Sequence, residues 1–422
     1  MSMDNTMKLE DFEIMSPVGS YESLMAAIEA GADSVYFGVG QLNMRSHSAN
    51  NFDLNDLKQI CDIAKQHNIK TYLTVNTVIY DEEIEYMHQV VDAAKANGIS
   101  AIIASDMAVI SYANSIGMEI HLSTQCNVTN FEAVKYYSKF ADVVVTAREL
   151  SLDKVKAITQ RIKQENLLGR NGDLMRIECF VHGALCMAVS GKCYISLDNA
   201  NMSANRGACL QFCRRPYKVT DMDGGTELMI DNEYILSPKD LKTIDFLDKI
   251  IDAGVRVFKI EGRGRSPEYV KVVTRCYKDA LKCYLNGTFS QEKLDNWNTD
   301  LRKVYNRDFW DGYYLGQRVG EWSNRYGSQA TTTKIFIGTV TNYFKNINVA
   351  EVRLETGELS LNDDIYIIGP TTGVYEDTIK EIRVDLKPVE KAVKGEMFSI
   401  PTSSVVRRND KLYKVIVKEP TK

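Results

Sequence analysis

Short apolar segments alternate with amphipathic segments over the first 260 residues of the chain. The amphipathic segments have the i, i+3, i+4 spacing of a helix that buries one face, as at Leu24, Ala27 and Ile28. Such alternation is typical of a parallel β-sheet covered by helices. We expect eight strands, at Glu13–Ser16, Ser34–Gly38, Thr71–Asn76, Ala101–Ser105, Glu119–Ser123, Val143–Thr146, Arg176–His182 and Arg256–Glu261.

Eight strand-helix units in about 280 residues favour a closed (β/α)8, TIM-like barrel. An open dinucleotide-binding sheet would need a glycine-rich turn after its first strand, and Ser16–Ser20 supplies no GxGxxG. The seventh and eighth expected strands are separated by about seventy residues, from Gly183 to Val255. In a barrel this insertion leaves the carboxyl ends of the strands, where active sites are found.

Beyond the expected barrel of residues 1–325, the pattern changes to short alternating strands with Gly, Asn and Asp turns. This pattern predicts a small C-terminal β-barrel at residues 331–422. The expected strands are Thr339–Tyr343, Asn348–Leu354, Asp364–Ile368, Thr378–Arg383, Met397–Ile400 and Lys411–Val417.

The composition is that of an ordinary globular protein, with 44% hydrophobic residues, 25% charged residues and a net charge of -5. No apolar run has the length of a membrane span, and the first residues lack the order of a signal peptide. We therefore expect a cytoplasmic protein with no membrane partner. In that compartment most of the nine cysteines stay reduced, which argues against a disulfide framework.

Five cysteines lie within the 35 residues from Cys179 to Cys213, a density that chance does not explain. Cys186 and Cys193 form one close pair, and Cys209 and Cys213 form another. Glycines stand near them, as expected where backbone folds tightly around a bound group. Cys179 lies on an expected strand, where core packing is the simpler role.

Four thiolates are soft ligands that select zinc, cuprous copper or an iron-sulfur cluster. Structural zinc usually has ligand pairs spaced C-x2-C to C-x4-C, so the C-x6-C pair of Cys186 and Cys193 suits a larger cluster better. We predict a 4Fe-4S cluster on Cys186, Cys193, Cys209 and Cys213, with zinc as the weaker alternative. Unconnected core thiols are the remaining interpretation.

The same segment resembles the defining motif of the U32 peptidase family. Its matching positions are Glu178-x-Phe180-x-x-Gly183-Ala184-Leu185-Cys186-x4-Gly191-x-Cys193-x-Ile195-Ser196. Similarity extends to Ser16–Ser20, to Arg206-Gly207-x-Cys209, to Lys259–Arg263 and to Asn306–Phe309. The chain is most similar to the branch that hydroxylates tRNA.

The resemblance implies an iron-sulfur protein that forms 5-hydroxyuridine at the tRNA wobble position without oxygen. It implies prephenate, a small carboxylate, as the hydroxyl source, and it makes a hetero-complex with a second family member plausible. It also makes Cys186 and Cys193 cluster ligands, with Cys209 and Cys213 completing the set. Other family members are described as collagen-degrading peptidases, so a peptidase is the first alternative. A non-catalytic RNA-binding or assembly module is the second.

The sequence shows no GxSxG and no HExxH, so neither a serine triad nor a zincin is indicated. Candidate catalytic residues are His182, Glu178 and Glu261, although a histidine at a strand end is equally well explained as a hydrogen-bonded structural residue. Candidate substrate-binding residues follow the expected strands: Arg45, Asn76, Gln125, Arg148 and Arg263. For two carboxylates, Arg148 and Arg263 are the preferred partners.

A basic stretch surrounds the second cysteine pair. Arg206, Arg214 and Arg215 lie in a region from Ala200 to Thr220 that contains no acidic residue. These side chains could bind tRNA phosphates or offset the charge of the thiolates. The aromatic residues among them could stack on an unpaired base, although packing is their usual role.

Overall fold

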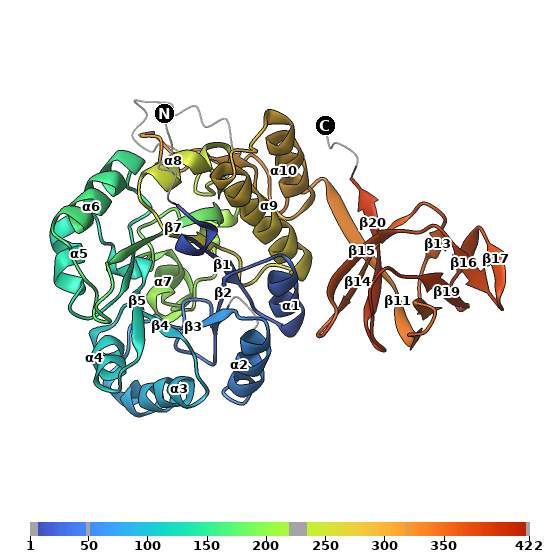
Figure 1. Cartoon of the computed structure of the whole chain (residues 1–422), viewed down its shortest axis with the longest axis horizontal. Helices are drawn as coiled ribbons and strands as arrows, with labels where there is room; N and C mark the ends of the chain where they lie inside the picture. Colours follow the sequence, from blue (N-terminus) through green and yellow to red (C-terminus); the bar gives the residue numbers. More distant parts are fainter. Residues whose placement is uncertain (1–6, 48–50, 219–233, 318, 419–422) are drawn as a thin grey trace.

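The computed structural model describes residues 7–47, 51–218, 234–317 and 319–418. Eight parallel strands close into a barrel, because the last of them pairs with both the first and the seventh. This confirms the predicted (β/α)8 architecture (Figure 1). The barrel strands are β1 (Glu13–Pro17), β2 (Ser34–Gly38), β3 (Lys70–Val75), β4 (Ala101–Ala104), β5 (Glu119–Leu122), β6 (Val143–Val145), β7 (Arg176–Gly183) and β9 (Val257–Ile260).

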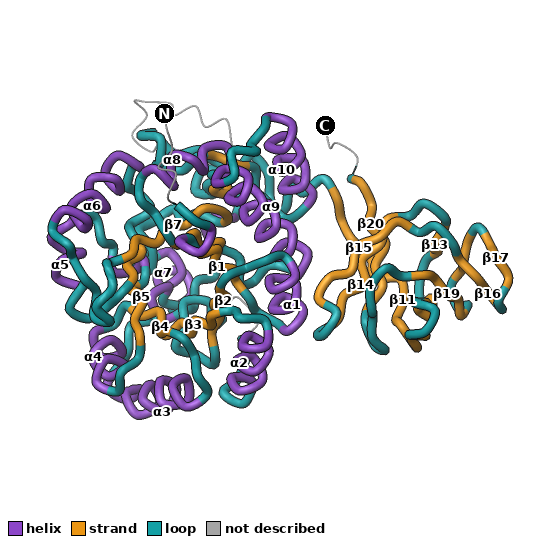
Figure 2. Tube along the Cα trace, in the orientation of Figure 1, coloured by secondary structure: helices purple, strands orange, loops and turns teal. Residues whose placement is uncertain are grey.

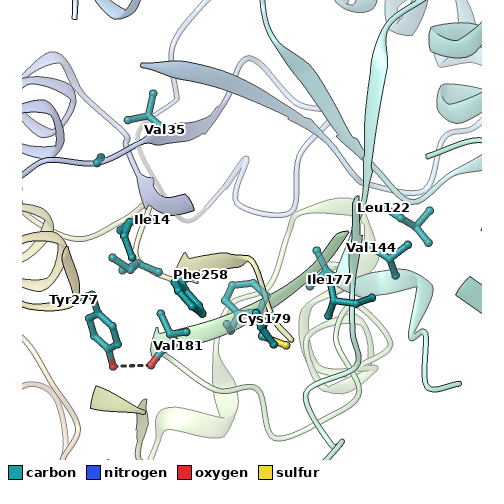
Figure 3. Packing of buried hydrophobic residues seen from close by; sticks show 14 of the residues in the cluster. Ile14, Val35, Leu122, Val144, Ile177, Cys179, Val181, Phe258 and Tyr277 are labelled. Atoms are coloured by element: carbon teal, nitrogen blue, oxygen red, sulfur yellow. Dashed lines mark hydrogen bonds between the residues drawn. The ribbon is translucent and has the colours of Figure 1, made fainter. Parts of the chain in front are cut away.

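Helices surround this barrel in the alternating order that the sequence predicts (Figure 2). Their apolar faces and the outward side chains of the strands form one core. Cys179 is part of that core beside Val181 and Phe258, as expected (Figure 3). The helices are α1 (Tyr21–Glu29), α2 (Asp56–Gln66), α3 (Ile84–Ala96), α4 (Met107–Ser115), α5 (Phe131–Tyr137), α6 (Leu152–Gln164), α8 (Leu247–Asp252), α9 (Pro267–Leu285) and α10 (Gln291–Lys303).

The insertion between β7 and β9 contains the short helix α7 (Ile195–Ala200) and a strand that the sequence analysis did not predict. This strand, β8 (Asp240–Lys242), pairs antiparallel with the end of β7 and parallel with β10 (Phe309–Trp310). The short strand lacks the apolar run by which a buried strand is recognised. Part of the predicted insertion, residues 219–233, lies outside the described residues.

The C-terminal part is antiparallel and has a hydrophobic core of its own. The expected strand at Thr378–Arg383 is wrong: β15 ends at Thr378, β16 begins at Ile382, and the three residues between them are irregular. Eight of the strands form one sheet, and β13 and β18 pair separately. The strands are β11 (Thr332–Phe344), β12 (Val349–Leu354), β13 (Glu358–Ser360), β14 (Asp364–Gly369), β15 (Gly373–Thr378), β16 (Ile382–Val384), β17 (Lys387–Val389), β18 (Lys391–Val393), β19 (Met397–Pro401) and β20 (Lys411–Val417).

This C-terminal part lies against α1 and α9 of the barrel (Figure 1). Ala26 of α1 packs with Ile368 and Val374, and Lys334 forms an ion pair with Glu268. The contact is on the outside of the barrel and includes the first turn of α9. In the described part of the chain, no helix has both the length and the apolar character needed to cross a membrane.

Candidate metal and substrate site

A cavity of about 220 Å³ lies at the carboxyl ends of the barrel strands. Its floor and walls come from residues on or just after β2, β3, β5, β7 and β9. The insertion after β7 supplies the opposite wall. The position is the one at which TIM-like barrels carry out chemistry, and it is where the sequence analysis placed the site.

All four predicted cysteine ligands, Cys186, Cys193, Cys209 and Cys213, line this cavity. Burial raises the pKa of the Cys213 thiol, and Arg214 opposes that rise. Cys186, Cys209 and Cys193 add to the rise, so each of them lies near Cys213. In the described residues, however, no three His, Cys, Asp or Glu side chains converge closely enough to hold a single metal ion. Tetrahedral zinc with sulfur bonds of about 2.3 Å requires close convergence, whereas a cluster accepts wider spacing. Four thiols at one cavity fit the donor set of a 4Fe-4S cluster.

Glycines position the loop that carries these cysteines. Gly207 has a φ of +78°, and a Cβ there would lie 2.3 Å from the carbonyl oxygen of Asn43. Gly191 also has a positive φ, and its Cβ would lie 2.9 Å from Cγ of Gln125. Only glycine fits such positions without moving the backbone. The tight folding predicted around the cysteines is confirmed at these two residues.

Positive charge dominates the cavity. Among the described residues that line it, seven are basic and one, Glu261, is acidic. Burial raises the pKa of Glu261, but Arg45, Arg148 and Arg263 outweigh that effect and hold the pKa at about 2. Glu261 is therefore a carboxylate at any physiological pH, and the remaining cations favour an anionic ligand. The seven basic residues are Arg45, Arg148, Arg214, Lys259, Arg263, Arg265 and Arg307.

The two arginines predicted to bind carboxylates are held in different ways. Arg263 is buried and donates hydrogen bonds to Oδ1 of Asn43 at 3.0 Å and to Oγ1 of Thr74 at 2.7 Å. The guanidinium of Arg148 lies 3.9 Å from the ring centroid of Phe180 and donates to the carbonyl of Ala184. Its Nε atom is buried and has no hydrogen-bond partner among the described atoms. Arg148 thus retains hydrogen-bonding capacity for a ligand.

Asn76 and Gln125 both line the cavity, as predicted. Nδ2 of Asn76 donates to Oγ of Ser123 at 3.1 Å and to Oε1 of Gln125 at 3.3 Å. Oδ1 of Asn76 accepts a hydrogen bond from the backbone N–H of Met44 at 3.2 Å. These contacts fix the amide groups as a polar wall beside the cations.

Two of the three candidate catalytic residues do not reach the cavity. His182 lies between the barrel and α9, with its ring against Tyr269, Tyr277 and Phe309. A bulge between Phe180 and His182 shifts the strand there, which the spacing along the sequence could not reveal. Burial lowers the pKa of His182 to about 3, so it is neutral and structural. Glu178 lies inside the barrel below the cavity, and Glu261 alone of the three lines it.

The predicted basic residues of the insertion also separate. Arg214 lines the cavity and donates to the carbonyls of Leu185 and Pro238, so it ties the cysteine loop to its surroundings. Arg206 forms an ion pair with Glu83, 123 positions away in sequence, and lies outside the cavity. Arg215 also lies outside, with its guanidinium 4.1 Å from the ring centroid of Phe212.

Several residues that line the cavity were not predicted from the sequence. Lys259 lies on β9 two positions before Glu261, and the alternation of side chains along a strand could have identified it. Tyr36 and Thr74 lie on neighbouring strands and could have been found in the same way. Arg307 comes from a segment beyond α10, and no local pattern connects it to the barrel mouth.

Comparison with known proteins places the chain in a family. The model of peptidase family U32 matches residues 19–324, and the chain belongs to this family. A protein of Porphyromonas gingivalis named collagenase is 60% identical over 97% of this chain and 99% of its own.

Two further relatives are named for RNA modification. The tRNA hydroxylation protein P1 of Bacillus subtilis is 30% identical over 88% of this chain and 86% of its own. The 23S rRNA 5-hydroxycytidine C2501 synthase of Escherichia coli is 33% identical over 75% of this chain but only 47% of its own. The names of the relatives thus divide between peptide hydrolysis and RNA hydroxylation.

Proposed function

We propose that the protein takes part in oxygen-independent hydroxylation of the wobble uridine of tRNA, which forms 5-hydroxyuridine. The observation that carries this proposal is one cavity in which four cysteines face a set of cations with a single carboxylate among them. Two relatives with RNA-hydroxylation names support it. Cytoplasmic location belongs to the same proposal, because tRNA is its substrate.

In this proposal Cys186, Cys193, Cys209 and Cys213 hold a 4Fe-4S cluster. A cluster there would supply redox or Lewis-acid chemistry at the cavity wall. The surrounding arginines offset the negative charge of thiolates and sulfide. Gly191 and Gly207 let the backbone fold closely enough to carry the ligands.

The cavity's cations suit prephenate, whose two carboxylates need two basic partners. Arg148 and Arg263 are the proposed partners, and Arg45 is already paired with Glu261. Placing a hydroxyl group on a pyrimidine carbon oxidises the base, so the hydroxyl donor is the co-reactant that is reduced. Glu261 stays ionised and orients Arg45. Arg215, on the outer side of the loop, is a candidate for contact with tRNA phosphates. Arg206 is a weaker candidate, because Glu83 neutralises its charge in an ion pair.

The test is mass spectrometry of tRNA nucleosides from a strain that lacks the gene. Loss of 5-hydroxyuridine and its derivatives is expected, with recovery when the wild-type gene is restored. Cys186→Ser should fail to restore the nucleoside, whereas Cys179→Ser, a change in the hydrophobic core, should restore it. An unchanged nucleoside content in the deletion strain would refute the proposal. If tRNA still bound the purified protein in that case, the RNA-binding or assembly module would be the better interpretation.

Peptide hydrolysis is the second candidate, supported by the collagenase name of a relative that is 60% identical. None of the described residues lining the cavity is a histidine, so the site offers no imidazole base for a cysteine or serine nucleophile. We expect metal-free purified protein to leave gelatin intact. Cleavage that disappears in Cys186→Ser would favour the peptidase. A second family member as partner is tested by co-purification with the tagged chain.

A further inference from the structure

Charged side chains occupy the inside of the barrel directly below the cavity. Barrel interiors are normally filled by branched apolar residues, and Met15, Ile103 and Val143 are of this kind here. Glu178 and His121 are nevertheless fully buried, and Lys259 is 4% exposed. Removing such groups from water costs several kcal/mol each unless they are well paired.

These residues form a continuous chain. Nζ of Lys259 lies 2.6 Å from Oε1 of Glu178, and Oε2 of Glu178 lies 3.4 Å from Nδ1 of His121. Nε2 of His121 is in turn 3.4 Å from Oε1 of Glu119, whose side chain is 28% exposed at the other end of the barrel. Lys259 is the member of this chain that lines the cavity. The chain therefore connects the cavity floor to the amino ends of the strands.

The charged groups around His121 balance one another, so they do not require the imidazole to be either neutral or charged. In the resting state the carboxylates of Glu13, Glu119 and Glu178 are matched by three cations, Lys70, Arg176 and Lys259. Tyr72 donates a hydrogen bond to Glu13, and its ring centroid is 4.3 Å from that of His121. His121 can therefore be neutral or charged. Burial lowers its pKa, but Glu119 and Glu178 outweigh that effect and raise the pKa above its ordinary value.

We propose that Lys259 delivers a proton to the ligand in the cavity, and that Glu178 and His121 are positioning residues that store and return this proton. This proposal rests on the proposed function for the identity of the ligand. The ammonium group of Lys259 protonates an oxygen of the bound carboxylate co-reactant and becomes an amine. Nδ1 of His121 then gives its proton to Oε2 of Glu178. The carboxyl group formed in this way protonates the Lys259 amine, which leaves Glu178 a carboxylate and His121 neutral.

The reservoir refills after the product leaves. Lys259 returns a proton through Glu178 to His121, and solvent that enters the cavity then protonates the Lys259 amine. Glu119 stabilises the charged imidazole through Nε2. One proton is delivered in each turnover, and no electron moves along the chain.

The experiment compares purified holoprotein variants in a 5-hydroxyuridine assay over a range of pH. Lys259→Met should lower the rate by about 100-fold, within the usual range for loss of a proton-transferring residue. Lys259→Arg keeps the charge but cannot release a proton, so it should be equally slow. Lys278→Met is the matched control, because Lys278 is a buried lysine 2.6 Å from Asp33 outside the barrel; it should keep the rate of the wild type.

His121→Gln tests the pH dependence of the rate, which would not change if His121 had a purely structural role. In the wild type the rate should fall as pH rises through the pKa of His121, because the reservoir empties. In His121→Gln this fall should be absent, and the rate should be low at every pH. A wild-type rate in Lys259→Arg, or an unchanged pH profile in His121→Gln, would overturn the proposal.

Calorimetry separates this inference from the proposed function. Prephenate binding should raise the pKa of His121 further and take up a proton, measured as a dependence of binding heat on the ionisation enthalpy of the buffer. His121→Gln should abolish this uptake. If the wild type forms no 5-hydroxyuridine, the proposed function fails. The proton chain is then tested by calorimetry alone: proton uptake on prephenate binding supports the chain, and no proton uptake refutes it.

Discussion

Nη2 of Arg45 and Oε1 of Glu261 lie 2.5 Å apart at the wall of the cavity. Arg45 comes from the loop after β2, and Glu261 directly follows β9. The pair therefore connects two elements that are neighbours of β1 on opposite sides. It fixes the one carboxylate of the cavity among its cations, so the site keeps a surplus of positive charge.

Replacing Glu261 by Gln should lower the free energy of unfolding by roughly 1–3 kcal/mol at pH 7, because it leaves three arginines without their shared counter-charge. The folded-state pKa of about 2 lies below the unfolded value, so the contribution is complete above about pH 5 and is lost as pH falls towards 2. Urea unfolding at pH 7 and pH 3 measures both effects. Glu165→Gln on the surface should leave stability nearly unchanged, because solvent screens an exposed ion pair. An undiminished difference at pH 3 would contradict this account.

Arg148→Met should weaken prephenate binding by roughly 10- to 100-fold, the usual effect of losing a charge-assisted hydrogen bond. Arg215→Met is the control, because Arg215 belongs to the same insertion but lies outside the cavity. Isothermal titration with each variant compares the two. Equal affinities in Arg148→Met and the wild type would remove Arg148 from the proposed carboxylate site.

Gly207→Ala should displace the cysteine loop. An alanine at the positive φ of Gly207 costs about 1 kcal/mol or more, and the alanine Cβ would overlap the backbone oxygen of Asn43. Gly98→Ala is the matched control, since Gly98 also has a positive φ but has no atom within 4 Å of the added Cβ. We expect a larger drop in melting temperature for Gly207→Ala, accompanied by loss of bound iron. The same iron content in both variants would contradict the tight loop.

His182→Phe should reduce the pH dependence of stability. The pKa of about 3 in the folded state lies below the ordinary value of 6.5, so the unfolded chain binds the proton first. Stability is therefore complete above about pH 6.5 and decreases at lower pH, by up to about 1.4 kcal/mol per pH unit. Urea unfolding of both proteins from pH 7 to pH 5 should give the smaller slope for the variant. Equal slopes would place a solvated histidine at this position.

The sequence predicted the barrel because short, mostly apolar strands alternate with amphipathic helices along the first 260 residues. It did not predict β8, since Asp240–Lys242 is short and polar and becomes a strand by pairing with β7 and β10. The sequence of Thr378–Arg383 has the pattern of one strand, although an irregular segment of three residues interrupts it. Alternation within short strands does not show where such a break falls.

The residues of the candidate site were predictable where a polar or charged side chain follows the end of a barrel strand. Arg45, Asn76, Gln125 and Arg148 line the cavity for that reason. His182 was misleading, because a bulge in β7 directs the ring towards α9. The side chain of Glu178 points into the barrel but lies one layer of side chains below the cavity. The sequence does not reveal this depth, because the depth depends on the length and tilt of the strands.

The shared cluster on Cys186, Cys193, Cys209 and Cys213 is the claim on which the other proposals depend most. Its direct measurement is the iron and acid-labile sulfide content of protein purified without oxygen. We predict about four iron and four sulfide per chain, as a single 4Fe-4S cluster requires, with loss of both in each of the four Cys→Ser variants. One zinc per chain without sulfide, or a full iron content in any of these four variants, would contradict the account.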